Sequence, residues 1–84
     1  MKPTIGRVVI YKTTEAERAT MKAAPYFGQY CNIQDELPAT VVAVWSDTCL
    51  NLRVKLDGSG PDVWRASVNQ GNEEGQWNWP VIEK

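Results

Sequence analysis

Residues 49–56, CLNLRVKL, alternate apolar and polar side chains without interruption. An extended chain turns successive side chains to opposite faces, so this segment predicts a strand with one buried face and one wet face. The buried face is formed by Leu50, Leu52, Val54 and Leu56, and the wet face by Asn51, Arg53 and Lys55. This period of two is incompatible with a helix and favours a β fold.

The segment just before it, ATVVAVW (39–45), is almost continuously apolar, which is typical of a strand covered on both faces. Only SDT (46–48) separates the two segments, and Asp47 suits a tight connection. Together the two segments predict an antiparallel β-hairpin.

Three further segments have strand character: IGRVVIY (5–11), VWRASV (63–68) and QWNWPVI (76–82). In the first, either Val8 and Ile10 or Val9 and Tyr11 point inward. In the second, we expect Trp64, Ala66 and Val68 to face the core, with Val63, Arg65 and Ser67 on the other side. In the third, Trp77, Trp79 and Val81 share one face, and Pro80, which cannot donate a ladder hydrogen bond, places the strand at an edge. Five short strands separated by Gly- and Pro-containing turns predict a mainly β fold, a five-stranded SH3-like small barrel.

Residues 12–38 form a long insertion between the first two predicted strands. Thr14 precedes Glu17 by three residues, the spacing of a capping box, and Pro25 ends the pattern, so we predict a short helix over residues 15–24. An irregular aromatic segment follows, which contains Tyr26, Phe27 and Tyr30. Long loops in small domains are commonly functional. The whole chain, residues 1–84, is predicted to be a single domain.

Four Trp residues are many for a chain of 84 residues. A domain of this size buries only about 60–65% of its unfolded surface, so large side chains must fill its core. We therefore expect two or three of the four to be core residues and the remainder to border a groove. The four are Trp45, Trp64, Trp77 and Trp79.

The chain contains no His and two Cys, Cys31 and Cys49, eighteen residues apart in sequence. Zinc sites need four ligands, usually Cys or His, so no metal and no cofactor is expected. Cys49 has no His to activate it as a nucleophile, and the neighbouring acidic pairs lie in polar loops. The composition therefore predicts a protein that is not an enzyme.

The charge is nearly balanced, with nine basic and ten acidic residues and a net charge of −1. Because phosphate contacts drive non-specific affinity for nucleic acid, general DNA or RNA binding is not expected. One local group stands out: Arg53 and Lys55 share a strand face, and Arg65 is predicted on the corresponding face of the next strand. The alternative is a solvated sheet face that discourages edge pairing. No apolar run is long enough for a membrane span, and no signal peptide is visible, so we expect residence in the cytoplasm and two free thiols.

Three sequence elements resemble a known family. GRVVIY, the hairpin pattern WSDTCxNLxVxxDG and the closing GxWxWP are similar to those of a family of small tailed-bacteriophage and prophage proteins. The resemblance covers residues 4–11 and 37–80 and leaves out the insertion at 12–36. It implies a phage accessory protein with an SH3-like barrel, and it brings no catalytic residues with it.

These observations predict a non-enzymatic bacteriophage binding protein that captures a host protein or a small anionic, nucleotide-like ligand, so as to counter bacterial defence. The alternative is a structural or assembly component of the phage particle, and a third reading is a nucleic-acid-binding small barrel. Aromatic stacking and phosphate donors would come from Tyr26, Phe27, Tyr30, Arg53, Lys55 and Arg65. The marginal helix and the aromatic segment also predict a homo-oligomer, most simply a C2 dimer, with the three aromatic residues near the contact.

Overall fold

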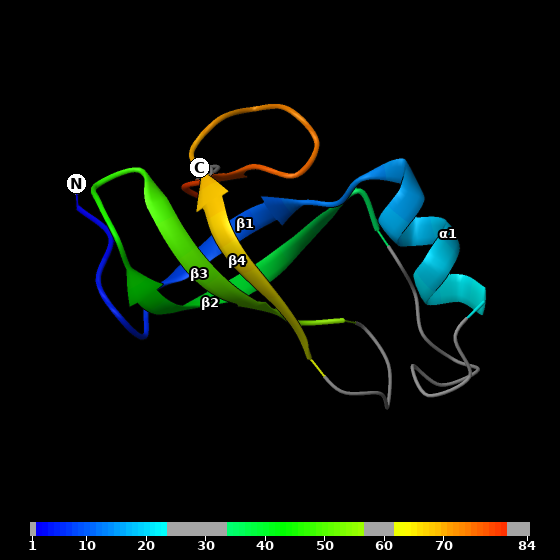
Figure 1. Cartoon of the computed structure of the whole chain (residues 1–84), viewed down its shortest axis with the longest axis horizontal. Coiled ribbons are helices and arrows are strands. Elements are labelled where there is room, and N and C mark those ends of the chain that lie inside the picture. Colours follow the sequence, from blue (N-terminus) through cyan, green and yellow to red (C-terminus); the bar gives the residue numbers. More distant parts are fainter. Residues whose placement is uncertain (1, 24–33, 57–61, 81–84) are drawn as a thin grey trace, which may run out of the picture.

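The computed structural model describes residues 2–23, 34–56 and 62–80. These residues form a mainly β structure with one short helix between the first two strands, as predicted (Figure 1). The predictions for Tyr26, Phe27, Tyr30, Cys31 and Val81 lie outside the described residues. The elements are β1 (Val8–Lys12), α1 (Glu15–Ala23), β2 (Glu36–Val44), β3 (Cys49–Val54), β4 (Val63–Asn69) and β5 (Trp77–Asn78).

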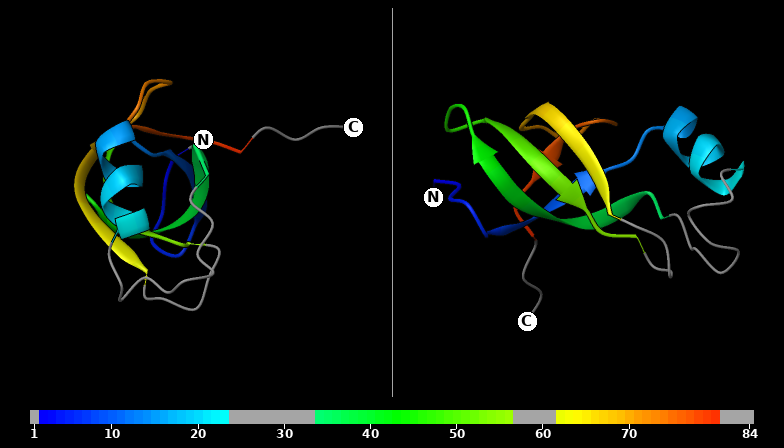
Figure 2. Two further views of the ribbon diagram at one scale, coloured as in Figure 1. Left: turned by 90° about the vertical axis from the view of Figure 1, so that its right-hand side faces the viewer. Right: turned by 60° about the horizontal axis from the view of Figure 1, so that its bottom comes forward.

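The five strands form one antiparallel sheet in the order β4-β3-β2-β1-β5. The sheet curls into a half-barrel, and a single parallel bridge between Gln70 and Trp77 links the chain after β4 to β5. The end-on view in Figure 2 shows this curl, with α1 in front of one open end of the half-barrel. β5 is an edge strand, in agreement with the prediction from Pro80.

The β2–β3 hairpin confirms the clearest sequence pattern. Leu50, Leu52 and Val54 are fully buried, and Arg53 on the opposite face is exposed. The connection is tight because the Ser46 hydroxyl accepts hydrogen bonds from the backbone N–H groups of Thr48, at 3.2 Å, and Cys49, at 3.0 Å. A polar side chain thus holds the tight connection, but it is that of Ser46 and not of Asp47, the residue that the sequence analysis named.

The prediction that residues 39–45 are covered on both faces is wrong for the described part of the chain. Leu37, Ala39 and Val41 are buried on the inner face, whereas Val42 is exposed. A bulge between Val41 and Ala43 shifts the register with β3. β2 is therefore a half-buried strand whose outer face is unusually apolar.

The face of the first strand, which the sequence left open, is settled by burial. Val9 and Tyr11 point into the core, whereas Val8 is exposed. Val8 lies opposite Thr40 on the outer face of the sheet. The inward face of β1 thus carries an aromatic hydroxyl to the end of the half-barrel nearest α1.

The predicted face of β4 is wrong at its first half. Trp64 is 54% exposed, and Val63 is buried instead. Val63 pairs with the inward Val54 and Trp64 with the outward Arg53. A register shift between Leu50 and Leu52 then brings Val68 back to the core. Trp64 therefore lies on the outer face and Arg65 on the inner face, the reverse of what the alternation predicted.

Trp77 is the largest fully buried side chain. Its indole Nε1–H donates to the Thr48 carbonyl at 3.0 Å, so the polar atom of the ring is satisfied inside the core. Trp79 is partly buried, and its ring meets Trp77 edge-on at 5.4 Å between centroids. Of the four Trp residues, one is therefore fully core and one partly, and Trp45 and Trp64 are exposed.

The helix begins with the predicted capping box. The Glu17 backbone N–H donates to the Thr14 hydroxyl at 3.0 Å, and the Glu17 carboxylate accepts from the Thr14 backbone N–H at 2.8 Å. These two bonds satisfy donors that a helix N-terminus leaves unpaired.

No helix in the described residues is both long enough and apolar enough to cross a membrane.

Candidate functional site

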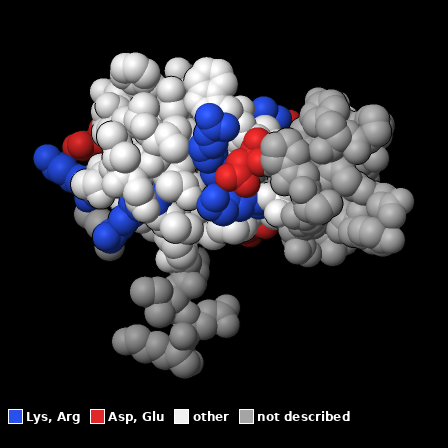
Figure 3. All heavy atoms as spheres, turned by 90° about the horizontal axis from the view of Figure 1, so that it is seen from below, with Lys and Arg blue, Asp and Glu red and all other residues white. Residues whose placement is uncertain are grey.

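The three predicted cationic residues do not form one patch. Arg53 is exposed on the outer face of β3, but Lys55 on the same face is paired with Asp62, Nζ to Oδ2 at 3.0 Å. Arg65 pairs with Leu52 in the register and turns to the inner side, where it bonds Glu17. Seen from below, Figure 3 shows basic side chains beside acidic ones near the middle of the view, with a broad uncharged area next to them. The predicted position of Arg65 beside Arg53 and Lys55 is therefore wrong.

Arg65 belongs instead to a polar cluster that holds α1 at the end of the half-barrel. The Tyr11 hydroxyl donates to Glu17 Oε1 at 2.7 Å, and Arg65 Nε donates to Glu17 Oε2. Burial raises the pKa of Glu17, but hydrogen bonds from Thr14, Tyr11 and Arg65 outweigh this and lower it below 4.5. The pKa of Tyr11 is raised to about 12. Burial is the largest cause, and the hydrogen bond to Glu17 is the next largest. This cluster holds α1 against the half-barrel and engages Arg65 Nε with Glu17 and Arg65 Nη1 with the Trp64 carbonyl.

A second cluster reinforces the same junction. Thr13 is fully buried, and its hydroxyl donates to the Gln34 carbonyl at 2.8 Å. Arg18 Nη1 donates to the Thr13 carbonyl at 2.8 Å, and Arg18 Nη2 lies 3.3 Å from Glu74 Oε2. These bonds join α1 to the chain before β2 and to the loop before β5, so α1 is docked by polar contacts.

Among the residues that the structure describes, the exposed Trp side chains lie on the outer face of β2–β4. Trp45 is 66% exposed and Trp64 is 54% exposed, and Arg53 lies directly opposite Trp64 in the β3–β4 register. We call this surface the Trp45–Trp64 face; it consists of Val42, Trp45, Asn51, Arg53 and Trp64. Among the described residues, no carboxylate lies within ion-pair distance of Arg53.

Asn51 organises this face. Its Oδ1 accepts a hydrogen bond from the Trp45 indole Nε1–H at 2.8 Å and another from the Ser67 backbone N–H at 2.8 Å. Ser67 has a φ of 54°, a left-handed conformation that non-glycine residues rarely adopt. The Asn51 side chain thus holds both the exposed indole of Trp45 and the bulge at Ser67. This bulge allows Trp64 to lie on the outer face although Val68 lies in the core. Strained backbone of this kind is frequent at functional sites.

Sequence reasoning missed this face because it placed Trp64 in the core. The alternation in residues 63–68 is compatible with either side of the sheet, and nothing within the strand signals the bulge at Ser67. Asn51, the uncharged polar residue on the wet face of residues 49–56, was the available signal. An Asn side chain has an acceptor that can bridge two neighbouring strands.

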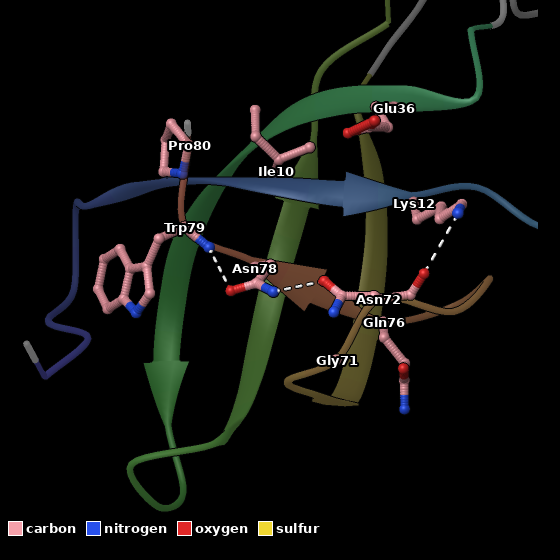
Figure 4. A pocket seen from close by; sticks show the side chains of 9 residues that line it. All are labelled: Ile10, Lys12, Glu36, Gly71, Asn72, Gln76, Asn78, Trp79 and Pro80. Atoms are coloured by element: carbon pink, nitrogen blue, oxygen red, sulfur yellow. Dashed lines mark hydrogen bonds between the residues drawn. The ribbon is translucent and has the colours of Figure 1, made fainter. Parts of the chain in front are cut away.

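A groove with a volume of about 750 Å³ lies over β1 and β5, at the β5 end of the sheet. Figure 4 shows Trp79 and Pro80 at one end, Asn78 in the middle, and Asn72 with Lys12 at the other end. Asn78 Nδ2 donates to Asn72 Oδ1 at 2.7 Å, and Lys12 Nζ donates to the Asn72 carbonyl at 3.2 Å. Its remaining lining residues are Ile10, Glu36, Gly71 and Gln76.

Cys49, the one cysteine within the described residues, is a half-buried free thiol at the start of β3. Across residues 2–23, 34–56 and 62–80, no three His, Cys, Asp or Glu side chains gather closely enough to hold a metal ion. The described surface carries exposed Trp rings and the guanidinium of Arg53, which has no carboxylate of the described residues within ion-pair distance.

Comparison with known proteins adds no further identification. The chain matches no protein-family model, and neither the curated proteins nor the solved structures contain a protein that is significantly similar to it.

Proposed function

We propose that this chain is a non-enzymatic binding protein that captures a protein partner through the Trp45–Trp64 face. The observation that carries the proposal is the pair of Trp side chains, 66% and 54% exposed, on the same outer face as Arg53. On the resemblance to small phage proteins, we propose that this capture takes place in the cytoplasm of an infected host and counters a bacterial defence. The curled five-stranded sheet is consistent with an SH3-like barrel.

The chemistry of the face favours a protein surface as the partner. Trp and Arg are enriched among the residues that contribute most to protein–protein binding, especially near the centre of an interface. Because Asn51 fixes the Trp45 ring, less side-chain entropy is lost on binding. Val42 in β2 is a further exposed apolar side chain. Arg53 adds a positive charge, so the complementary surface should carry an apolar pocket next to a carboxylate.

The same geometry argues against general nucleic-acid binding. The chain has a net charge of −1, Lys55 is neutralised by Asp62, and Arg65 by Glu17. A small nucleotide-like anion stays as a second candidate, because Trp64 and Arg53 lie opposite one another and supply a ring and a phosphate donor.

The test compares proteins captured from host lysate by wild-type protein, Trp45→Ala, Trp64→Ala and Arg53→Gln. Ile5→Ala is the control, because Ile5 is an apolar residue with an even larger exposed fraction, 72%, but lies before β1 and is not part of the Trp45–Trp64 face. We expect one partner to be lost with all three face variants and retained with the control. Equal capture by all proteins would disprove the proposal.

Two further measurements separate the alternatives. Titration of a nucleotide panel against ¹⁵N-labelled protein reveals the anionic-ligand alternative through shifts of the Trp45 and Trp64 indole resonances. Mass spectrometry of purified phage particles reveals a structural or assembly role, in which the same face would form a contact between subunits.

The predicted homo-oligomer is a separate part of the proposal. The residues expected near the dimer contact, Tyr26, Phe27 and Tyr30, lie outside the described part of the chain. Light scattering at micromolar concentration tests it, since one chain has a mass of 9.4 kDa. A measured mass of a single chain would contradict the dimer without affecting the proposed face.

A further inference from the structure

One side of β4 has no neighbouring strand among the described residues. β4 stands at the end of the strand order and pairs with β3 alone, and the bridge from Gln70 to Trp77 lies beyond its last residue. Unpaired backbone N–H and C=O groups along such a free side are a template on which another extended chain can add. The free side of β4 is therefore a potential interaction surface.

The pairing of β2 with β3 shows which backbone groups of β4 face this free side. The Lys55 N–H, directly after β3, donates to the Pro38 carbonyl in β2 at 2.9 Å. Successive residues of a strand direct their backbone groups to opposite sides, so Arg53, two positions earlier, also faces β2. Trp64 is the partner of Arg53 in the β3–β4 register and therefore directs its N–H and C=O away from β3. Trp64 thus presents one donor and one acceptor to the free side.

The acceptor is closed by a side chain of the same strand. Arg65 Nη1 donates to the Trp64 carbonyl at 3.1 Å, and Arg65 Nε donates to Glu17 Oε2 on α1. The Tyr11 hydroxyl holds Glu17 in turn, at 2.7 Å from its Oε1. The planar fork of a guanidinium can bond two acceptors at once in a fixed geometry. A single side chain, anchored on α1, thus occupies the free side of β4.

The bulge at Ser67 limits the same side. The Ser67 N–H is already bonded to Asn51 Oδ1 at 2.8 Å, and the register with β3 shifts at this point. Bulges and inward-pointing charged side chains are two ways in which proteins keep edge strands from pairing with other chains. β4 has both, and the regular part of its free side ends before Ser67.

We infer that Arg65 is a latch that closes the free side of β4, and that its release lets β4 pair with β4 of a second copy of the chain. An identical edge strand is already ordered by its own sheet, so pairing with it costs less conformational entropy than ordering a free peptide. Pairing would also set Trp64 against the second copy. The latch therefore keeps Trp64 available in the Trp45–Trp64 face, although the inference rests on the edge of β4 and not on the proposed capture.

The charges and the backbone groups together select the register of this pair. Two copies of one strand pair antiparallel about a twofold axis. An axis at Arg65 would bring two like charges directly opposite each other, which is unfavourable. An axis at Trp64 lets each Trp64 N–H donate to the Trp64 carbonyl of the other copy and sets the two indole rings opposite each other. These bonds require the carbonyl that Arg65 Nη1 occupies.

The experiment measures mass by light scattering and the hydrogen exchange of the Trp64 amide, both at about 100 μM protein, where a dimer of micromolar affinity is populated. Arg65→Thr removes both bonds of the latch and keeps a residue with strand preference. We expect about twice the wild-type mass and about tenfold slower exchange of the Trp64 amide, because that amide gains an acceptor.

Arg18→Thr is the matched control, because Arg18 also docks α1, through the Thr13 carbonyl and Glu74, and has no bond to β4. It should keep the wild-type mass and the wild-type exchange of Trp64. Glu17→Gln keeps the guanidinium but weakens its anchor, so it should increase the mass in the same direction by less, and it serves as the test if Arg65→Thr does not fold.

Three results would overturn the inference. The first is the wild-type mass in every folded variant of Arg65 and Glu17. The second is an equal increase of mass in Arg18→Thr, which would show that general loosening of α1 causes the association. The third is a larger mass without slower exchange at Trp64, which would place the contact elsewhere.

Discussion

β3 and β4 are neighbours in the sheet and have equally regular alternation in sequence, yet only β3 keeps it in the structure. In β3 the buried residues Leu50, Leu52 and Val54 follow one another at intervals of two. In β4 the buried residues are Val63 and Val68, five positions apart. In a regular strand an odd separation places two side chains on opposite faces, so β4 needs an irregularity to bury both.

Alternation of apolar and polar residues therefore identifies a strand but does not decide which face of it is buried. In β3 only one face is apolar. In β4 both faces offer apolar residues, and the choice is made by groups far away in sequence: Glu17 on α1 bonds Arg65 on the inner side, and Asn51 bonds the bulge at Ser67. Four substitutions, three of them paired with a comparison variant, test this difference between β3 and β4.

The largest effect is expected for Trp77→Ala. Trp77 is fully buried, and it joins the β2–β3 connection to the chain after β4 through its bonds to Thr48 and Gly71. The free energy of unfolding should fall by about 3–5 kcal/mol in urea denaturation. Trp79→Ala should cost less, because Trp79 is only partly buried. Equal losses would restore the simpler expectation that both residues share one face of a regular strand.

Glu17→Gln should have the next largest effect, because it removes the charge that draws Arg65 inward. Glu17 accepts from Tyr11, Thr14 and Arg65, so we expect a loss of about 1–3 kcal/mol at neutral pH. Glu15→Gln is the matched control, as Glu15 is exposed in the same helical turn.

The pH dependence of the free energy of unfolding provides a second measurement on Glu17→Gln. The pKa of Glu17 is lower in the folded state than its ordinary value of 4.5, so its stabilisation is complete above that value and is lost as the pH falls through the folded-state pKa. Urea denaturation between neutral and acidic pH should show a smaller acid-induced loss in Glu17→Gln than in Glu15→Gln. The same acid-induced loss in both variants would contradict the assigned role of Glu17.

These contacts also show what sequence reasoning could and could not reach. The capping box of Thr14 and Glu17, the hairpin and the buried face of β3 follow from local patterns, and all three are confirmed. The outward position of Arg53 follows from the same alternation. The inward turn of Arg65 does not, because its partner lies 48 positions earlier in sequence.

The two bulges and the groove were equally beyond local patterns. The bulges near Val42 and Ser67 decide which apolar side chains are exposed, and each depends on pairing between strands. The groove is assembled from β1, β5 and the loop of residues 70–76, where Asn72 meets Asn78. In the sequence that loop has only the appearance of a polar connection.

Two substitutions in the bulge should change the free energy of unfolding by smaller amounts, and the two changes should have opposite signs. Ser67 has a φ of 54°, which glycine adopts without steric strain, so Ser67→Gly should raise the free energy of unfolding by about 0.5–1 kcal/mol. Ala66→Gly, one position earlier in the same strand, should lower it by a similar amount, because Ala66 is not among the residues with positive φ. Thermal and urea denaturation of the two variants measure both; the same sign for both would mean that Ser67 is unstrained.

The smallest effect on stability is expected for Trp64→Ala, although it removes one of the largest side chains. At 54% exposure, with its neighbour Arg53 also in solvent, the ring contributes little to the core, so the free energy of unfolding should change by less than about 0.5 kcal/mol. The same substitution should abolish capture of the proposed partner, since an exposed Trp at the centre of an interface commonly contributes most of the binding energy. A loss of several kcal/mol would show that Trp64 faces the core after all, that β4 is regular like β3, and that the Trp45–Trp64 face does not exist.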